Sequence, residues 1–175
     1  MACIYGNIMK IDTTGASQAT ANQDRLNIIG VEASKKLAET DLARMEKYKS
    51  MITKVGREKQ MDPAVIAAII SRQSRAGATL EDGWGDHGYA FGLMQVGFSP
   101  NTLPANVFSH LASLASINVI NRLRNKTNKP SGGISAYNAG VSTVSSYENI
   151  DARTSGKDFS NDVVARAQWF KSKGY

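Results

Sequence analysis

The chain has 175 residues, of which 42% are hydrophobic and 21% charged, as is ordinary for a folded globular domain. These values argue against a disordered tail, a collagen-like chain and a coiled-coil rod, and no apolar stretch is long enough to span a membrane. The single cysteine, Cys3, excludes an intrachain disulfide, and we interpret it as an incidental thiol. The first residues lack the pattern of a signal peptide, so we expect cytoplasmic retention, another export route or a removed leader.

The charges are distributed unevenly along the chain. Lys and Arg number 21 and Asp and Glu 15, and the net charge of +6 favours an anionic partner such as nucleic acid, an acidic membrane or a cell wall. However, residues 76–121 contain no Lys or Arg, and residues 87–147 contain no Asp or Glu. A nucleic-acid-binding surface would be lined with Lys and Arg. The uncharged middle therefore favours a neutral polar ligand such as a sugar polymer, and we expect no nucleic-acid partner.

The first sixty residues predict short helices. Residues 1–29 are weakly periodic and rich in Thr, Ala and Asn, which indicates turns and a helix or two. Residues 31–39 predict a short helix. From 41 to 58, apolar residues recur every three or four positions, which predicts a helix with one apolar face. The many basic residues of this stretch are typical of a solvated helix face.

The clearest helix comes next. Asp62 is a good N-cap, Pro63 suits the first helical position, and Gly77 suits the position just beyond the helix end. Residues 65–70 are apolar around the whole helix, which predicts a buried central position. Gln73 continues the buried face at the C-terminal end.

The rest of the chain adds a turn region and further helices. Four glycines within residues 83–92, together with aromatic residues, predict turns or a small hairpin over 78–97. We expect further segments at 104–123 (helix), 126–133 (loop), 134–139 (helix) and 160–174 (helix). The sequence thus predicts one mainly α domain over residues 1–175.

Three short segments each set a polar side chain among small or apolar residues. They are Ser71-Arg-Gln-Ser-Arg-Ala-Gly77 with Gln73, Phe91-Gly-Leu-Met-Gln-Val96 with Gln95, and Gly132-Gly-Ile-Ser-Ala-Tyr-Asn-Ala-Gly140 with Tyr137 and Asn138. A single buried Gln is commonly a structural residue whose amide is satisfied by backbone groups. Each segment alone is therefore a weak signal.

Together and in this order, the segments resemble the goose-type (g-type) lysozymes, and more distantly the catalytic domain of bacterial lytic transglycosylases. The resemblance covers residues 1–96 and 132–175, and it includes Tyr5-Gly-Asn, Ile11-Asp-Thr-Thr-Gly-Ala, Pro63-Ala-Val-Ile-Ala, Gly83-Trp-Gly-Asp86 and Asn161-Asp-Val-Val-Ala-Arg-Ala-Gln168. It implies a mainly α lysozyme-like fold with a sugar-binding cleft. It also implies cleavage of the β-1,4 bond between N-acetylmuramic acid and N-acetylglucosamine in peptidoglycan, with chitin oligosaccharides as weaker ligands. A secreted monomer without a cofactor is the family expectation.

The chain departs from the family pattern at the positions that the resemblance assigns to catalysis. Gln73 stands where the family has its general-acid glutamate, and an amide has no proton acidic enough for the leaving oxygen. Gly97 stands where the family has an Asp, whereas Asp86 matches a family candidate for the second carboxylate. Residues 98–131 do not align with the family. We therefore expect an inactive or weak enzyme, and the pattern indicates an engineered variant or a natural non-catalytic paralogue.

The other candidate residues each carry two interpretations. Trp84 could stack on a sugar ring or pin its glycine-rich turn, and Gln95 could orient a cleft group or serve the backbone. By the resemblance, Tyr137 and Asn138 lie along the cleft floor, whereas the alternative for Tyr137 is a core aromatic with a satisfied hydroxyl. The two histidines lie far apart and have no cysteine partner, so we expect no metal site.

Three functions follow as hypotheses. The first is a g-type lysozyme scaffold that binds peptidoglycan or chitin-type oligosaccharides and hydrolyses them poorly or not at all. The second is an active lysozyme that uses Asp86, Glu81 or Asp82 as its acid. The third is a non-enzymatic basic module that binds polyanions, or a lysozyme-shaped target for a proteinaceous inhibitor.

Overall fold

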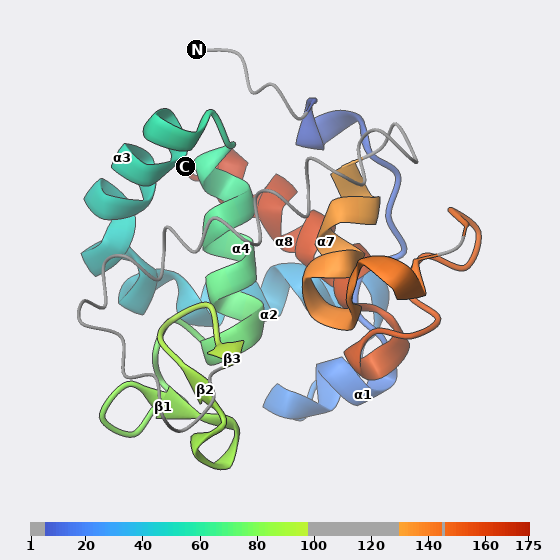
Figure 1. The fold of residues 1–175 in the computed structure, drawn as a ribbon, viewed down its shortest axis with the longest axis horizontal. Coiled ribbons are helices and arrows are strands. Elements are labelled where there is room, and N and C mark those ends of the chain that lie inside the picture. The colour runs from blue at the N-terminus through green and yellow to red at the C-terminus, as the bar shows by residue number, and fades with distance from the viewer. Residues whose placement is uncertain (1–5, 98–129, 145) are drawn as a thin grey trace.

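The structure, a computed structural model, describes residues 6–97, 130–144 and 146–175, and most of these residues are helical (Figure 1). The described helices are α1 (Gln18–Ala21), α2 (Gly30–Met45), α3 (Lys49–Lys59), α4 (Pro63–Ser74), α7 (Pro130–Ala139) and α8 (Phe159–Ser172). Three short strands, β1 (Trp84–Gly85), β2 (Ala90–Phe91) and β3 (Val96–Gly97), form one antiparallel sheet in the order β1-β2-β3. Short 3-10 helices lie at Ile8–Lys10, Asn22–Asp24, Glu46–Tyr48, Asp86–Gly88, Val141–Thr143 and Ser155–Lys157. The predicted mainly α fold with a small hairpin is confirmed, and a third strand extends the hairpin.

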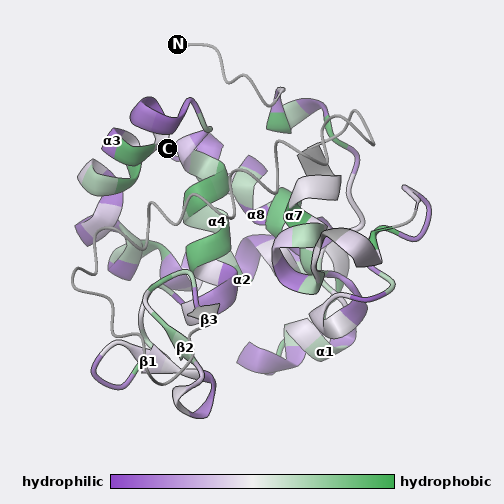
Figure 2. Ribbon diagram, viewed as in Figure 1, coloured by the Kyte–Doolittle hydropathy of each residue, from purple (hydrophilic) through white to green (hydrophobic). Residues whose placement is uncertain are grey.

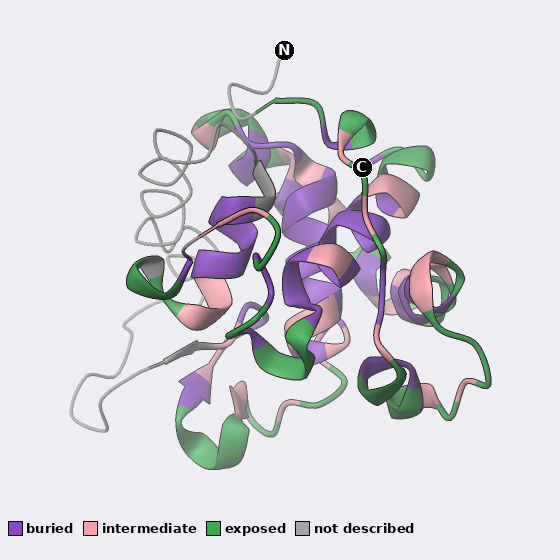
Figure 3. Cartoon of the chain, turned by 90° about the vertical axis from the view of Figure 1, so that its right-hand side faces the viewer, coloured by how far each residue is buried: buried purple, intermediate pink, exposed green. Residues whose placement is uncertain are grey.

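Helix α4 lies at the centre of the fold, as its apolar sequence predicts. Every residue from Ala64 to Ser71 is buried, and α4 packs against α8, α3 and α2. Figure 1 shows α4 crossing the middle of the molecule with the small sheet at its C-terminal end, and Figure 2 shows its hydrophobic residues. The buried residues gather in the central helices, whereas the exposed ones lie mostly in the surrounding turns and outer helices (Figure 3). Gln73 therefore stands where a buried, rigid helix reaches the surface beside the sheet.

Asp62 caps α4 as predicted, but the end of the helix differs from the prediction. The Asp62 carboxylate accepts a hydrogen bond from the Ala64 backbone N–H at 3.0 Å. The helix ends at Ser74, and Arg75 takes the left-handed conformation two residues before Gly77. A left-handed conformation is unfavourable for arginine, but the guanidinium is held by ion pairs to Asp24 and Asp41 at 2.6 and 2.9 Å. The helix thus ends earlier than the position of Gly77 predicts, and the tertiary contacts of Arg75 stabilise this earlier end.

Other boundaries also move, while residues 98–129 lie outside the described residues. Helix α2 runs through position 40, where the sequence suggests a break, and α7 begins at Pro130 instead of 134. Helix α8 begins one residue before Ser160, the predicted cap. Its first turn is capped by Asp151, whose carboxylate accepts from the Ser160 and Asn161 backbone N–H groups at 2.7 and 3.0 Å. The expected helix at 104–123 and nearly all of the unfamiliar segment fall outside the described residues.

A buried charge network ties α4 to its neighbours. We define it as Asp24, Asp41, Asp158, Asp162, Arg72, Arg75 and Arg166. The side chains of Asp41, Asp162 and Arg166 are fully buried. Such charges are tolerated in an interior only when they are paired and hydrogen-bonded. The network therefore fixes how α2, α4 and α8 pack.

The hydrogen bonds of the network are short, although the buried Arg166 Nη2 has none within the described residues. Asp162 accepts from Ser34 Oγ at 2.7 Å, from Arg72 Nη1 at 2.7 Å and from Arg166 Nε at 3.1 Å. Asp41 accepts from Ser71 Oγ at 2.7 Å. Asp162 and Asp41 thus each have both a cation and a hydroxyl as partners, which offsets much of the desolvation that burial costs.

The network predicts that acid destabilises the protein. The hydrogen bond from Arg75 holds the pKa of Asp24 below its ordinary value of 3.8. Burial alone would raise the pKa of Asp162, but the charges of Arg166 and Arg72 outweigh it and keep that pKa low. A lowered folded-state pKa contributes stability above pH 3.8, and this stability is lost as the pH falls through the folded value.

We expect the melting temperature to be level near neutral pH and to fall as the pH drops below about 4, where the unfolded state binds more protons. Thermal unfolding followed by circular dichroism checks this. Asp24→Asn should lower the melting temperature at neutral pH, and it should make the fall of the melting temperature at acid pH less steep. An equally steep fall in the variant would show that Asp24 does not contribute to the acid destabilisation.

Candidate functional site

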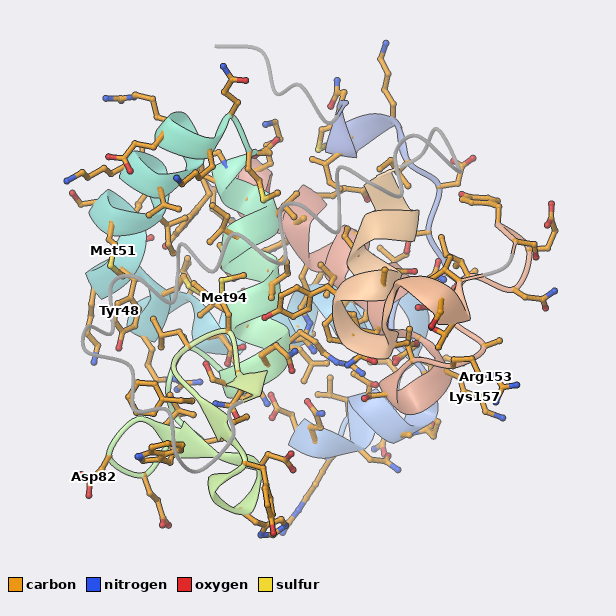
Figure 4. All side chains as sticks on the ribbon, viewed as in Figure 1. Tyr48, Met51, Asp82, Met94, Arg153 and Lys157 are labelled. Atoms are coloured by element: carbon orange, nitrogen blue, oxygen red, sulfur yellow. The ribbon has the colours of Figure 1, made fainter. Side chains whose placement is uncertain are left out.

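The three polar segments singled out in the sequence meet at one hydroxyl group. Tyr137 on α7 donates its hydroxyl proton to the backbone oxygen of Met94, which lies between β2 and β3. The Gln73 side chain, on the last turn of α4, lies close enough to the same hydroxyl to lower the pKa of the phenol. Figure 4 shows Met94 beside α4.

Tyr137 is held as a neutral hydroxyl. Burial raises the pKa of its phenol well above the ordinary value, and the nearby Gln73 side chain opposes this shift only in part. The ring stacks on Phe159 of α8, with centroids 6.3 Å apart and an angle of 14° between the planes. Tyr137 is thus packed as a core aromatic with a satisfied hydroxyl, and its predicted place along the cleft floor stays a prediction. A neutral phenol can orient a neighbour but supplies no charge.

Asn138 is engaged with the turn before α8. Its Oδ1 accepts from the Ser155 backbone N–H at 2.8 Å, and its Nδ2 lies 3.2 Å from Ser155 Oγ as a donor. The side chain is only half-buried. The structure therefore shows a structural contact for Asn138, and its predicted contact with substrate stays a prediction.

Two candidate residues support the sheet. The ring of Trp84 meets Phe91 edge-on, with centroids 4.8 Å apart. Gln95 has a left-handed backbone, and its Nε2 donates to the Gly92 carbonyl oxygen at 2.9 Å. Its side chain also packs on Gly85, where an added Cβ would lie 2.2 Å from Gln95 Oε1. Trp84 and Gln95 thus pin the strands, and their predicted roles toward sugar stay predictions.

The carboxylates of the sheet lie on its exposed side. Asp86 opens the 3-10 turn between β1 and β2, where it is exposed and has a left-handed backbone. Asp82 and Glu81 are exposed as well. Figure 4 shows Asp82 at the outer edge of the sheet, directed away from α4. This direction disfavours Asp82 as an acid acting beside Gln73.

The chemistry of this candidate site is limited by residue 73. The Gln73 amide can donate and accept hydrogen bonds, but it cannot donate a proton to a leaving group. Tyr137 is neutral, and the Met94 contribution is a backbone oxygen. Within the described residues, no three side chains of His, Cys, Asp or Glu group together as a metal site would require. The described helices also include none that is long and apolar enough to cross a membrane.

A hollow of about 390 Å³ lies elsewhere, between the N-terminal segment and the start of α8. None of the predicted site residues lines it, because its walls are Asp12, Thr13, Thr14, Tyr147, Glu148, Ile150, Ser160, Asn161 and Val164. The candidate site is therefore the side-chain cluster around Tyr137 and not this hollow.

Sequence reasoning missed three residues that surround the cluster. Arg72 contacts both Ser155 and Phe159, Ser155 contacts Asn138, and Phe159 stacks on Tyr137. Arg72 offered one signal, because it is a charged residue directly before Gln73 in a helix that is otherwise buried. Ser155 and Phe159 carry no comparable signal, because their contacts arise only from the tertiary fold.

Comparison with known proteins identifies the family of the chain and agrees with its fold. The family model described as Lysozyme g matches residues 5–174. Lysozyme g of Cyprinus carpio is 60% identical over 186 residues, which cover 100% of each chain. Lysozyme g of Epinephelus coioides is 51% identical over 98% of this chain and 99% of its own, and that of Gallus gallus is 47% identical over 98% and 86%. The chain therefore belongs to the lysozyme g family.

Proposed function

We propose that this chain is a lysozyme-type glycosidase scaffold that binds peptidoglycan across the β-1,4 bond between N-acetylmuramic acid and N-acetylglucosamine, and that hydrolyses this bond poorly. The observation that carries the proposal is Gln73. By the family resemblance it stands at the general-acid position, and it lies beside the Tyr137 hydroxyl, where the three matched segments meet. We therefore expect a site that is assembled and lacks its acid.

The chemistry of glycoside cleavage explains why one amide matters. Water attacks the anomeric carbon, the bond to the leaving oxygen breaks, and that oxygen must receive a proton. A carboxylic acid supplies this proton, whereas the Gln73 amide can only hydrogen-bond to the oxygen. In an inverting reaction a second carboxylate activates the water, and Asp86 is our candidate for it. Substrate binding needs none of these proton transfers, so it is expected to survive.

Several finer expectations belong to the same proposal. By family resemblance, we expect chitin oligosaccharides to be weaker ligands, the protein to act outside the cell as a single-domain monomer, and a proteinaceous lysozyme inhibitor to be an additional partner. Trp84, Gln95, Tyr137 and Asn138 are the proposed substrate contacts. No cofactor enters the proposed chemistry.

Sedimentation with purified insoluble peptidoglycan tests the proposal. We expect the chain to co-sediment at both low and high salt, because contacts to the uncharged sugar rings of the glycan are weakly screened, and soluble oligosaccharide should release it. Binding that disappears at high salt and is unaffected by soluble oligosaccharide would instead identify a polyanion-binding module.

Lysis by the unaltered chain separates the proposal from an active enzyme. We expect the turbidity of a cell-wall suspension to fall hardly faster than without protein. Clear lysis that Asp86→Asn abolishes would contradict the proposal and would assign the acid to Asp86.

A further inference from the structure

We propose that Arg72 is a positioning residue of the candidate site. Through two separate routes of contact, it fixes Tyr137 and Asn138 against residue 73. The inference rests on the proposed function only in taking these side chains as substrate contacts. The geometry itself is independent of that function.

The Arg72 guanidinium is itself rigidly held. Its side chain is only 6% exposed, and Nη1 donates to Asp162 Oδ2 at 2.7 Å and to Thr20 Oγ1 at 2.9 Å. Nη2 donates to Asp158 Oδ1 at 3.0 Å. A planar fork with buried partners on several sides has little freedom to move. Arg72 can therefore serve as a fixed reference for what it contacts next.

The first route runs through hydrogen bonds to Asn138. Arg72 Nη2 donates to the Ser155 carbonyl oxygen at 3.0 Å. The Ser155 backbone N–H donates to Asn138 Oδ1 at 2.8 Å, and Asn138 Nδ2 donates to Ser155 Oγ at 3.2 Å. The Ser155 backbone is thus joined to Arg72 on one side and to Asn138 on the other.

The second route runs through two aromatic rings to Tyr137. The Arg72 guanidinium carbon lies 5.4 Å from the centroid of the Phe159 ring, within the range of a cation–π contact. Phe159 in turn stacks on Tyr137. The Tyr137 hydroxyl then contacts Gln73, the residue directly after Arg72 in α4.

Both routes lead from Arg72 to the last turns of α7, and the second returns to α4 at residue 73. The placement of Tyr137 and Asn138 relative to residue 73 is therefore set by a closed ring of contacts. Lysine at position 72 keeps the positive charge but has one nitrogen in place of a planar fork. It can pair with Asp162 or Asp158, but it cannot also reach Ser155 and stack on Phe159.

Arg72→Lys tests the inference, with Arg75→Lys as the matched control. Arg75 lies three residues later, and its described contacts run to Asp24 and Asp41 and not toward α7. Hydrogen exchange of the ligand-free protein, followed by mass spectrometry, is the first measurement. We expect Arg72→Lys to speed exchange over residues 134–140 by about tenfold, while α2 changes little. Arg75→Lys should leave residues 134–140 as they are.

Affinity for an N-acetylglucosamine hexasaccharide, measured by calorimetry, is the second measurement. We expect Arg72→Lys to weaken binding about tenfold and Arg75→Lys to change it less than about twofold. Equal effects of both variants on exchange and affinity would overturn the inference, because Arg72 would then only stabilise the fold. If the unaltered chain does not bind the sugar, the proposed function fails and the exchange measurement alone decides the role of Arg72.

A second variant keeps the test decisive if Arg72→Lys does not fold. Phe159→Leu removes the aromatic route and leaves the Arg72 ion pairs in place. We expect faster exchange over residues 134–140 with the exchange of α2 retained. Unchanged exchange there would overturn the aromatic route.

Discussion

Gln73→Glu should raise the rate of peptidoglycan hydrolysis by roughly 10²- to 10⁴-fold, the usual contribution of a general acid. Glu has nearly the shape of Gln, so the contacts around Tyr137 need little rearrangement. Residue 73 is half-buried beside a neutral phenol, and partial burial favours the protonated form of a carboxyl group. The variant therefore introduces an acid where the leaving oxygen requires one.

Clearing of a cell-wall suspension measures this gain, and two controls define its cause. Gln73→Ala should give no gain, because it supplies no proton. Asp86→Asn added to Gln73→Glu should remove much of the gain if Asp86 activates the water. No gain at all from Gln73→Glu would mean that the substrate is not held for cleavage, and that the loss of the acid is not the main defect.

Asp162→Asn should lower the free energy of unfolding by about 3–5 kcal/mol, the usual cost of removing one partner from a buried ion pair. The Asp162 side chain is fully buried and accepts from Arg72, Arg166 and Ser34. Asparagine has a similar volume, so the loss reflects charge and not packing. Arg166, which is also fully buried, would lose its closest anionic partner.

Urea unfolding at neutral pH measures this loss, and Glu32→Gln is the control. Glu32 pairs with Lys35 at 2.7 Å, but its side chain is 71% exposed, so we expect no measurable change. A loss of less than about 1 kcal/mol for Asp162→Asn would show that the network is hydrated and does not fix the packing of α4 and α8.

Local sequence patterns predict much of this fold, because its central elements are encoded locally. The run of apolar residues after Pro63 predicts α4, and the glycines around Trp84 predict the turns of the sheet. The buried charge network could not be predicted in this way. Asp41 lies in a stretch that is typical of a solvated helix face, but Ser71 of α4 and Arg75, just beyond the helix end, pack against it. Helix α4 ends at Ser74, ahead of the glycine.

The sequence predicts which residues belong to the candidate site, but it does not predict which of them contact one another. Gln73 and Tyr137 could be singled out because a polar side chain among apolar neighbours needs a partner. That the two partner each other, and that Met94 contributes a backbone oxygen, depends on how α4, α7 and the sheet pack. Asn138 could also be singled out from the sequence, but its observed partner, Ser155 in the turn before α8, could not be predicted.

Calorimetric titration of the unaltered chain with an N-acetylglucosamine hexasaccharide at moderate salt tests the central claim most directly. The claim is that the site is assembled and lacks only its acid, so it predicts saturable binding that persists when salt is raised. The absence of binding would contradict the claim, and membership of the lysozyme g family would then describe the fold of this chain and not its function.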